Sequence, residues 1–277
     1  MHMKTYPSVL TIAGSDCSGG AGIQADIKAI SALGGYAASA ITAVTVQNTV
    51  GVNAIHPIPA DIVRGQIDAV MTDICPKAIK IGMINDVEIV KVIAEAIQTY
   101  HPQHVVFDPV MISTSGYKLI EDEAIDAIKK YLIPLATIIT PNLNEAKVLY
   151  DKELNNIDDM KAAAKDLLGM GCKSILIKGG HLEGNLMCDI LQTDDHNEPY
   201  MFCAQKVESR NTHGTGCTLS SAIATCLALG MELPDAVASA KDYVFHGIEQ
   251  GKDIHIGEGH GPLNHFYSPQ PMHIMDK

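Results

Sequence analysis

The stretch "SVLTIAGSDCSGGAGIQADIKAISALGG" (residues 8–35) reads as one strand–loop–helix unit. The β-branched run at 8–14 predicts a buried strand, and a glycine-rich loop then leads into a helical pattern at 20–35. The larger apolar residues of that pattern recur at helical spacing: Ile23, Ile27, Ile30 and Leu33. Two glycines follow as a helix stop signal. The unit therefore predicts a strand and a helix packed together, as in α/β proteins.

Similar units continue to the end of the chain. Further strands are predicted at 38–46, 77–83, 104–110, 137–142 and 174–180. Helices are predicted at 59–73, 121–131, 143–150, 158–170, 217–229 and 234–250, with one more starting at Asn85, which has capping-box spacing to Glu88. The runs 187–193 and 199–206 predict an antiparallel hairpin. We therefore expect a single domain over residues 1–277, with a mainly parallel central sheet in a three-layer α/β/α fold.

The overall composition narrows the class of partner. Hydrophobic residues make up 47% of the 277 residues, and the formal net charge is −12. That charge disfavours nucleic acid and anionic membranes as partners. No apolar run reaches the roughly 18 residues that a membrane span needs. Seven cysteines without a C-x-x-C pair favour a reducing compartment, so we expect a cytoplasmic protein.

Polar side chains lie where several of the predicted strands end. Asp108 lies near the end of one strand and Asn142 ends the next, with Glu145 one helical turn further on. Lys178 follows the strand after that. Because ligands bind at the carboxyl ends of parallel strands, we expect these side chains in one crevice. Together they offer carboxylates for Mg²⁺ and a lysine for phosphate.

The sequence "HGTGC" (213–217) joins a glycine-rich turn to the start of a helix. It fits neither the P-loop nor the dinucleotide-binding pattern. Gly214, Thr215 and Gly216 predict a small anion hole at the positive end of that helix. The same helix end is expected to lower the pKa of Cys217 from about 8.5, which would make a thiolate accessible near neutrality. Such a group could act as a nucleophile or as a proton acceptor.

The spacing of the cysteines and histidines does not indicate a metal site. Close Cys and His partners with zinc spacing are lacking around Cys217. Three further cysteines are expected to pack as buried thiols: Cys172, Cys188 and Cys226. A zinc site is therefore not expected.

Seven motifs together resemble the ribokinase superfamily and, within it, the hydroxymethylpyrimidine/phosphomethylpyrimidine kinases of thiamine biosynthesis. The motifs are "TIAGSDCSGGAGIQADIKA", "TAVTVQNTVGV", "KIGM", "VVFDPVM", "ITPNLNEA", "LIKGGH" and "HGTGCTLSSAIA". The resemblance covers nearly the whole chain and implies a ribokinase-like fold. It also implies ATP and Mg²⁺ as reaction partners, with K⁺ as a further candidate ion, and a homodimer.

The resemblance implies a role for each site residue. Asn142 and Glu145 match the motif that organises Mg²⁺ and the nucleotide phosphates, and Asp108 matches an aspartate close to the metal. Lys178 would neutralise the transferring phosphate. The anion hole is matched by Gly214, Thr215 and Gly216, and the pyrimidine site by Gly14, Asp26, Gln47, Met83 and Val110.

Cys217 matches the position where most sugar-kinase relatives have an aspartate base. The resemblance therefore implies that this thiol accepts the hydroxyl proton of the acceptor. Cys17 and the lid region at 111–118 match only loosely and receive no role.

The resemblance implies ATP-dependent phosphorylation of 4-amino-5-hydroxymethyl-2-methylpyrimidine and then of its monophosphate. A pyridoxal/pyridoxine kinase is the nearest alternative, and Gln47 favours the pyrimidine because an amide can both donate to a ring nitrogen and accept from an amine. A non-catalytic binding protein on the same fold is the alternative of another class. Retention of Asp108, Glu145, Lys178 and Cys217 argues against it. A cysteine-nucleophile hydrolase lacks an obvious His/Asp partner pair.

Overall fold

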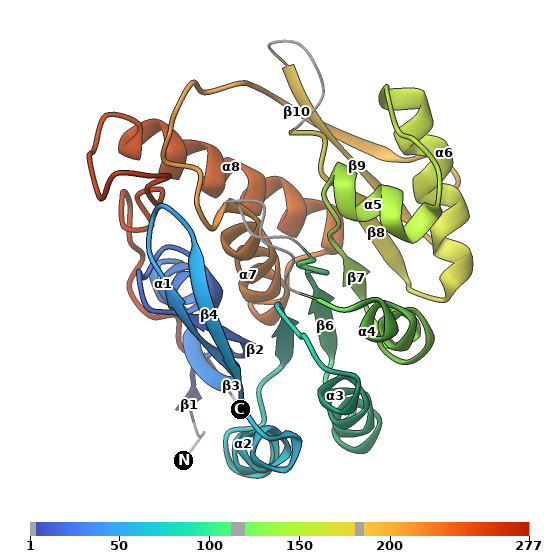
Figure 1. Ribbon diagram of the computed structural model, residues 1–277, viewed down its shortest axis with the longest axis vertical. Helices are drawn as coiled ribbons and strands as arrows, with labels where there is room; N and C mark the ends of the chain where they lie inside the picture. The colour runs from blue at the N-terminus through green and yellow to red at the C-terminus, as the bar shows by residue number, and fades with distance from the viewer. Residues whose placement is uncertain (1–3, 112–119, 181–185, 277) are drawn as a thin grey trace.

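The computed structural model describes residues 4–111, 120–180 and 186–276. A nine-stranded sheet runs through the middle of this part of the chain, in the order β10-β9-β8-β7-β6-β5-β2-β3-β4 (Figure 1). Its six parallel strands are β2 (Ser8–Asp16), β3 (Tyr36–Gln47), β5 (Ala78–Ile81), β6 (His104–Phe107), β7 (Ile138–Ile139) and β8 (Ser174–Ile177). The antiparallel strands lie at the edges: β4 (Val52–Pro57), β9 (Leu186–Thr193) and β10 (Tyr200–Gln205).

Helices cover both faces of this sheet. One face carries α1 (Gly22–Ala32), α7 (Thr215–Ala228) and α8 (Leu233–Gly251). The other carries α2 (Ala60–Asp73), α3 (Val87–Tyr100), α4 (Asp122–Ala127), α5 (Leu143–Tyr150) and α6 (Ile157–Leu167). A π-helical turn at Ile128–Leu132 and 3₁₀ turns at Ile133–Leu135 and Leu168–Met170 extend two of them. The three-layer α/β/α prediction is confirmed.

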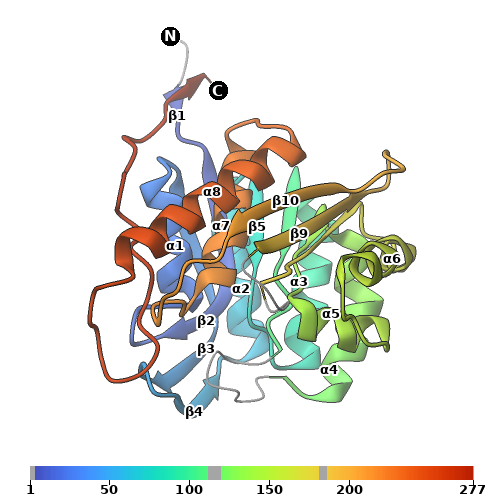
Figure 2. The same ribbon diagram turned by 90° about the horizontal axis from the view of Figure 1, so that it is seen from above.

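Two large hydrophobic clusters, one on each face of the sheet, form most of the core of the described residues. All four residues of β5 and all four of β8 are buried, as expected for strands covered by helices on both sides. Away from the main sheet, β1 (Lys4–Thr5) pairs antiparallel with β11 (Met275–Asp276), which brings the two ends of the chain together (Figure 2). None of the helices in the described residues is long and apolar enough to cross a membrane.

The structure corrects several local predictions. α3 is capped by Asp86, whose carboxylate accepts from the N–H groups of Glu88 and Ile89, so the cap is not Asn85. On α1 the buried face includes Asp26, while Ile27 is exposed. The run 52–57 was not predicted as a strand because most of its side chains are exposed, yet it pairs with β3 as β4.

The prediction that Cys188 packs as a buried thiol is also wrong. Cys188 forms a disulfide with Cys203, its cross-strand partner in the β9–β10 hairpin, and therefore does not pack as a free thiol. The pairing joins residues 15 apart in the sequence, so a search for close cysteine spacings does not find it. Cys172 and Cys226 are buried and free, as predicted.

The order of the strands determines where a ligand can bind. Strands β3 and β5 lie on opposite sides of β2 in the sheet. The connections from neighbouring strands therefore run in opposite directions on the two sides of the boundary between β2 and β5. A crevice forms at the carboxyl ends of strands at such a switch point. The loops after β2, β5 and β6 and the start of α7 all meet there.

Candidate active site

A cavity of about 750 Å³ lies at the carboxyl ends of the parallel strands. Its lining includes all but one of the residues that the sequence placed in a site: Gly14, Gln47, Met83, Asp108, Val110, Asn142, Glu145, Lys178, Gly214, Thr215, Gly216 and Cys217. The exception is Asp26, which is fully buried below the cavity. The structure therefore brings together the predicted phosphate-binding and ring-binding residues in one space.

Lys178 and Asp108 form an ion pair at the wall of the cavity. The Lys178 Nζ lies 2.9 Å from Asp108 Oδ1, and Thr140 donates to the same carboxylate oxygen at 3.1 Å. Burial opposes the charge on Lys178, but the carboxylates of Asp108 and Glu145 outweigh it and raise the pKa of the lysine. Lys178 is therefore a fixed positive charge that faces the cavity.

Glu145 lies close to this pair, in the first turn of helix α5. Its carboxylate accepts from the backbone N–H of Asn142 at 2.8 Å, and Asn142 Oδ1 accepts from the Glu145 N–H at 3.0 Å. This capping box fixes both side chains at the helix start. Burial raises the pKa of Glu145 to about 7; Lys178 opposes the shift and Asp108 adds to it. Two buried carboxylates that repel each other provide a place for a cation.

The turn before α7 has the geometry of an anion site. Gly214 caps the helix with φ +77°, and a Cβ there would collide with the carbonyl oxygen of Gly20. A Cβ on Gly216 would lie 3.2 Å from Lys178 Nζ and 3.5 Å from Asp108 Oδ2. Glycine at these positions lets the first turn of α7 approach the Lys178–Asp108 pair closely. The positive end of α7 and the Lys178 ammonium group therefore lie side by side in the cavity lining.

Cys217 lies in the first turn of α7 and lines the cavity, but its predicted acidity is wrong. Burial raises the pKa of the thiol to about 11, against the opposing effects of the Lys80 charge and of a hydrogen bond from the Gly22 backbone. A helix N-terminus contributes only about 0.3–1 kcal/mol in exposed settings. Removal from water can shift a pKa by several units. The thiol is therefore protonated at neutral pH.

Asp26 forms an ion pair with Lys80 beneath the cavity. Lys80 Nζ lies 2.8 and 2.9 Å from the two carboxylate oxygens, and both side chains are fully buried. Thr11 donates to Asp26 at 2.5 Å and Ser221 at 2.8 Å. These contacts satisfy the carboxylate within the core. The role in substrate binding that the resemblance implied for Asp26 stays a prediction, and the geometry gives it no direct access.

The opposite wall of the cavity is mostly uncharged. Met83 and Val110 pack with Ala43 in a small apolar cluster, and Thr42 donates to the Met83 carbonyl at 2.8 Å. The amide of Gln47, at the end of β3, also lines the cavity on this side, together with Asp16 and His213. Apolar side chains with a few polar groups at one end suit a flat heteroaromatic ring.

Residues at both ends of the cavity received no site role from the sequence. Asp16 and His213 line it beside Gln47, and both belong to the quoted motifs. At the other end, Asp189 accepts from Lys241 at 2.5 Å and from the Gly179 N–H at 2.9 Å. The apolar lining there comes from α8: Val244, Phe245 and Ile248. No local sequence pattern indicates this second end of the cavity, because its residues come from β9 and α8, which are far apart in the sequence.

The donor set fits Mg²⁺ held together with phosphate. In the described residues, groups of three or more His, Cys, Asp or Glu side chains arranged around a metal site do not occur. Mg²⁺ is commonly held by one or two carboxylates with substrate phosphates and water. Asp108 and Glu145 are the two carboxylates that line the cavity near Lys178. They match that mode and do not match a closed all-protein metal site.

Comparison with known proteins places the chain among vitamin kinases. Residues 16–264 match the family model described as phosphomethylpyrimidine kinase. A hydroxymethylpyrimidine/phosphomethylpyrimidine kinase of Rhizobium meliloti (strain 1021) is 44% identical over 259 residues, which span 93% of this chain and 96% of that protein.

Two solved structures are also similar. The phosphomethylpyrimidine kinase of Clostridium difficile 630 is 48% identical with a TM-score of 0.78, and the match covers 87% of this chain and 99% of that one. The pyridoxal kinase of Staphylococcus aureus in complex with pyridoxal is 33% identical with a TM-score of 0.87, covering 99% and 100%. Backbone similarity is thus high to both activities, while sequence identity is higher to the pyrimidine kinases.

Proposed function

The chain belongs to the phosphomethylpyrimidine kinase family, and from this premise we propose how its cavity works. The protein is a phosphotransferase that acts on 4-amino-5-hydroxymethyl-2-methylpyrimidine and on its monophosphate, with ATP as donor. The observation that carries the proposed mechanism is one cavity lined by Lys178, by the start of α7 and by Gln47. Phosphoryl transfer needs mainly alignment and charge neutralisation, and these groups supply both.

The donor half of the reaction is assigned to the charged wall. Lys178 neutralises the charge that develops on the transferring phosphoryl group, and the N–H groups at the start of α7 hold its oxygens. Asn142 and Glu145 position the nucleotide phosphates. Asp108 and Glu145 are the residues that would hold Mg²⁺, which would further neutralise the phosphate charge when bound. The apolar residues of α8 provide a surface for the base of the nucleotide.

The acceptor half is assigned to the uncharged wall. Gly14, Met83 and Val110 surround the pyrimidine ring, and Gln47 binds its polar edge. Cys217 accepts the hydroxyl proton in the first phosphorylation. Because the resting thiol is protonated, it must first release its own proton to solvent. In the second phosphorylation the acceptor is already an anionic phosphate, so a base matters less.

A panel of acceptors with ATP and Mg²⁺ tests this function. We expect kcat/KM for the aminopyrimidine to exceed that for pyridoxal, with mono- and diphosphate products appearing in succession. The products are resolved by anion-exchange chromatography. A higher kcat/KM for pyridoxal would overturn the acceptor assignment while leaving the kinase assignment intact.

The similarity to the pyridoxal kinase structure supports a second activity. Its TM-score of 0.87 shows that the two chains share the same overall fold over nearly their whole length. Pyridoxal phosphorylation as a side activity is therefore proposed, and the same panel measures it. Dependence on K⁺ is read from the same assay with Na⁺ as the replacement.

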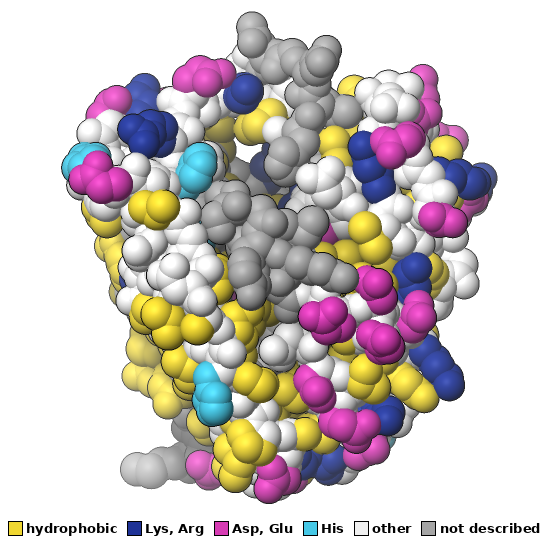
Figure 3. All heavy atoms as spheres, viewed as in Figure 1, with side chains coloured by type: hydrophobic (Ala, Val, Ile, Leu, Met, Phe, Trp, Pro, Cys, Tyr) yellow, Lys and Arg dark blue, Asp and Glu magenta, His cyan; other side chains and the backbone are white. Residues whose placement is uncertain are grey.

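We propose a homodimer in a cytoplasmic location. Hydrophobic side chains gather on the surface over β3 and β4 (Figure 3). Val44, Val46 and Val50 are 43%, 57% and 65% exposed on this edge hairpin, where apolar residues favour association. Light scattering measures the mass in solution. Five cysteines are free thiols, which supports a reducing compartment, whereas the Cys188–Cys203 disulfide does not.

A further inference from the structure

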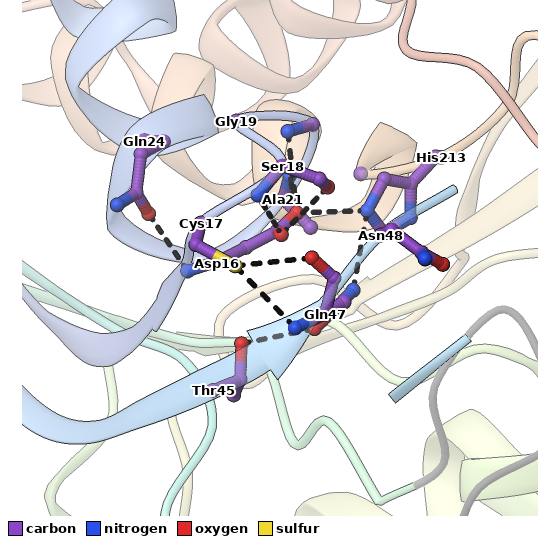
Figure 4. Close-up of polar contacts among 12 residues, drawn as sticks. Asp16, Cys17, Ser18, Gly19, Ala21, Gln24, Thr45, Gln47, Asn48 and His213 are labelled. Carbon is purple, nitrogen blue, oxygen red and sulfur yellow. Dashed lines mark hydrogen bonds and ion pairs between the residues drawn. The ribbon is translucent and has the colours of Figure 1, made fainter. Parts of the chain in front are cut away.

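The amide of Gln47 lies between two polar side chains at the acceptor end of the cavity. Gln47 Nε2 is placed 3.3 Å from His213 Nε2, and Gln47 Oε1 is placed 3.2 Å from Thr45 Oγ1 (Figure 4). The nitrogen and oxygen of a glutamine amide have almost the same shape, so the surrounding hydrogen bonds must decide which is which. Both neighbours have other partners that fix their polarity.

Asp16 fixes the polarity of His213. Its carboxylate accepts from the Ser18 N–H at 2.9 Å, the Ser18 hydroxyl at 2.7 Å, and the N–H groups of Gly20 and Ala21 at 3.2 and 2.8 Å. Burial opposes ionisation, but these hydrogen bonds, together with that from His213, hold the pKa of Asp16 well below its usual range. An ionised carboxylate only accepts hydrogen bonds. His213 Nε2, 2.8 Å from Asp16 Oδ2, therefore carries a proton and donates it.

The atom of Gln47 that faces His213 must then be an acceptor. If the amide nitrogen faced His213 Nε2, two N–H groups would point at each other. With the amide turned over, the oxygen accepts from the same N–H that Asp16 shares. Thus His213 favours the orientation in which Gln47 Oε1 lies toward the imidazole.

Thr45 requires the same orientation independently. Its hydroxyl donates to the Ser15 carbonyl oxygen at 2.9 Å, and a carbonyl can only accept. The Thr45 oxygen is therefore left to accept from Gln47, which needs the amide nitrogen on that side. Two unrelated neighbours thus agree on one orientation: oxygen toward His213 and nitrogen toward Thr45.

The backbone around this amide is already fixed. Cys17 Sγ donates to the Gln47 carbonyl at 3.0 Å and accepts from its N–H at 3.4 Å, which gives Cys17 a role in the structure. The imidazole of His213 packs directly against Gly20, so its ring has little freedom to move. With the backbone held, the Gln47 amide can still adopt either of two orientations. The N–H of His213 favours the one in which the amide oxygen faces the imidazole.

We infer that His213 is a positioning residue that sets acceptor specificity by holding the Gln47 amide in one orientation. In that orientation the amide offers the cavity one acceptor next to one donor. A ring that presents a nitrogen beside an exocyclic amine matches this pair with two parallel hydrogen bonds. Rings that lack the adjacent amine match only half of it. The inference rests on the proposed function and names the group that makes its acceptor choice selective.

The test uses His213→Phe, which removes the N–H but keeps a ring against Gly20. Steady-state kcat and KM are measured with the aminopyrimidine and with an analogue that has hydrogen in place of the amine. We expect KM for the aminopyrimidine to rise roughly tenfold, as for the loss of one ordinary hydrogen bond. The analogue should change by less than about twofold, because it makes no hydrogen bond to the positioned oxygen. In a Gln47→Ala background, His213→Phe should have no further effect.

Two controls keep the result interpretable. Thermal unfolding of His213→Phe checks that the loop is intact, and His255→Phe, at an exposed histidine outside the cavity, checks the substitution itself. Equal losses with both acceptors, or an undiminished loss in the Gln47→Ala background, would overturn the inference and assign His213 to the anion-hole turn. If the wild-type protein fails to phosphorylate the aminopyrimidine, the proposed function falls and this inference with it.

Discussion

Two of the lysine–aspartate pairs in the described residues, Lys80–Asp26 and Lys178–Asp108, have nearly equal lengths, but the first lies in the core and the second lines the cavity. Lys80 Nζ lies 2.8 Å from Asp26 in the core, where both side chains are 0% exposed. Lys178 Nζ lies 2.9 Å from Asp108 at the cavity wall, where the lysine side chain is 15% exposed. The distances are alike, so the surroundings must account for any difference in role.

The surroundings differ in how fully they satisfy the charges. In the core pair, Thr11 and Ser221 complete the hydrogen bonds of Asp26, and the pair is shielded from ligands. In the cavity pair, the lysine can still meet an incoming phosphate. The comparison teaches that a buried ion pair can serve the fold or the reaction, and that access to the cavity separates the two. Charges from both pairs act on the pKa of the Cys217 thiol: Lys80 lowers it, whereas Asp26 and Asp108 raise it.

Breaking the core pair should have the largest effect, and the effect should be on stability. Lys80→Met leaves the Asp26 carboxylate buried without its counter-ion, which typically costs about 3–5 kcal/mol of unfolding free energy. Urea unfolding followed by circular dichroism measures it. The double variant Lys80→Met/Asp26→Asn should recover part of the loss. A cost below about 1 kcal/mol for Lys80→Met would show that the core pair is not structural.

The same substitution in the cavity pair should affect catalysis instead. Lys178→Met is expected to lower kcat about 10²–10³-fold in both phosphorylation steps, because it removes charge stabilisation from the transferring group. Its unfolding free energy should fall less than that of Lys80→Met. Product-resolved kinetics at saturating ATP gives the two rates. A variant that kept one step at full rate would contradict the role of Lys178 on the donor side.

Substitution of Cys217, whose pKa is affected by both ion pairs, tests whether the thiol acts as the base in the first phosphorylation. Cys217→Ala should slow formation of the monophosphate by about a hundredfold, the lower range for loss of a general base, and affect the second step much less. Because the pKa is raised to about 11, the thiolate fraction grows with pH. The wild-type first step should therefore accelerate up to about tenfold per pH unit between roughly pH 7 and 9, and Cys217→Ala should lose this slope.

A carboxylate should replace the thiol in part. Cys217→Asp is expected to restore some of the first step and to flatten its pH dependence, since a carboxylate is already ionised at neutral pH. Trapping of a phosphorylated or substrate-linked Cys217 during turnover would show a covalent role and contradict the assignment as a base.

Glu145, at the edge of the cavity pair, provides the smallest expected effect when the change is taken per pH unit. Its pKa is raised from 4.5 to about 7, so the folded state binds more protons than the unfolded state between these pH values. Unfolding free energy should then fall as pH rises through this window, by at most about 1.4 kcal/mol per unit, and level off above it. Glu145→Gln should remove this contribution. An unchanged slope in denaturant titrations from pH 5 to 8 would contradict it.

Local patterns predicted most of the secondary structure. The run at 59–73 forms α2 (Ala60–Asp73), and the predicted hairpin forms β9 and β10, because periodicity and turn residues act over short distances. The edge strand β4 was missed because its exposed side chains give no clear alternation of buried residues. The start of α7 at Thr215 differs from the predicted 217 by the usual uncertainty of helix ends.

The sequence by itself determined the α/β fold, the family and the residue types that meet at one edge of the sheet, since these follow from order along the chain. Only the tertiary structure decided which groups are accessible and what state they are in. It placed Asp26 against Lys80, 54 residues away, and out of the cavity. It raised the pKa of Cys217 where the helix end alone predicts a lower one, because burial outweighs a local dipole. It also brought His213 to Gln47 across 166 residues, which no local pattern encodes, because polarity in a hydrogen-bond network depends on every neighbour in space.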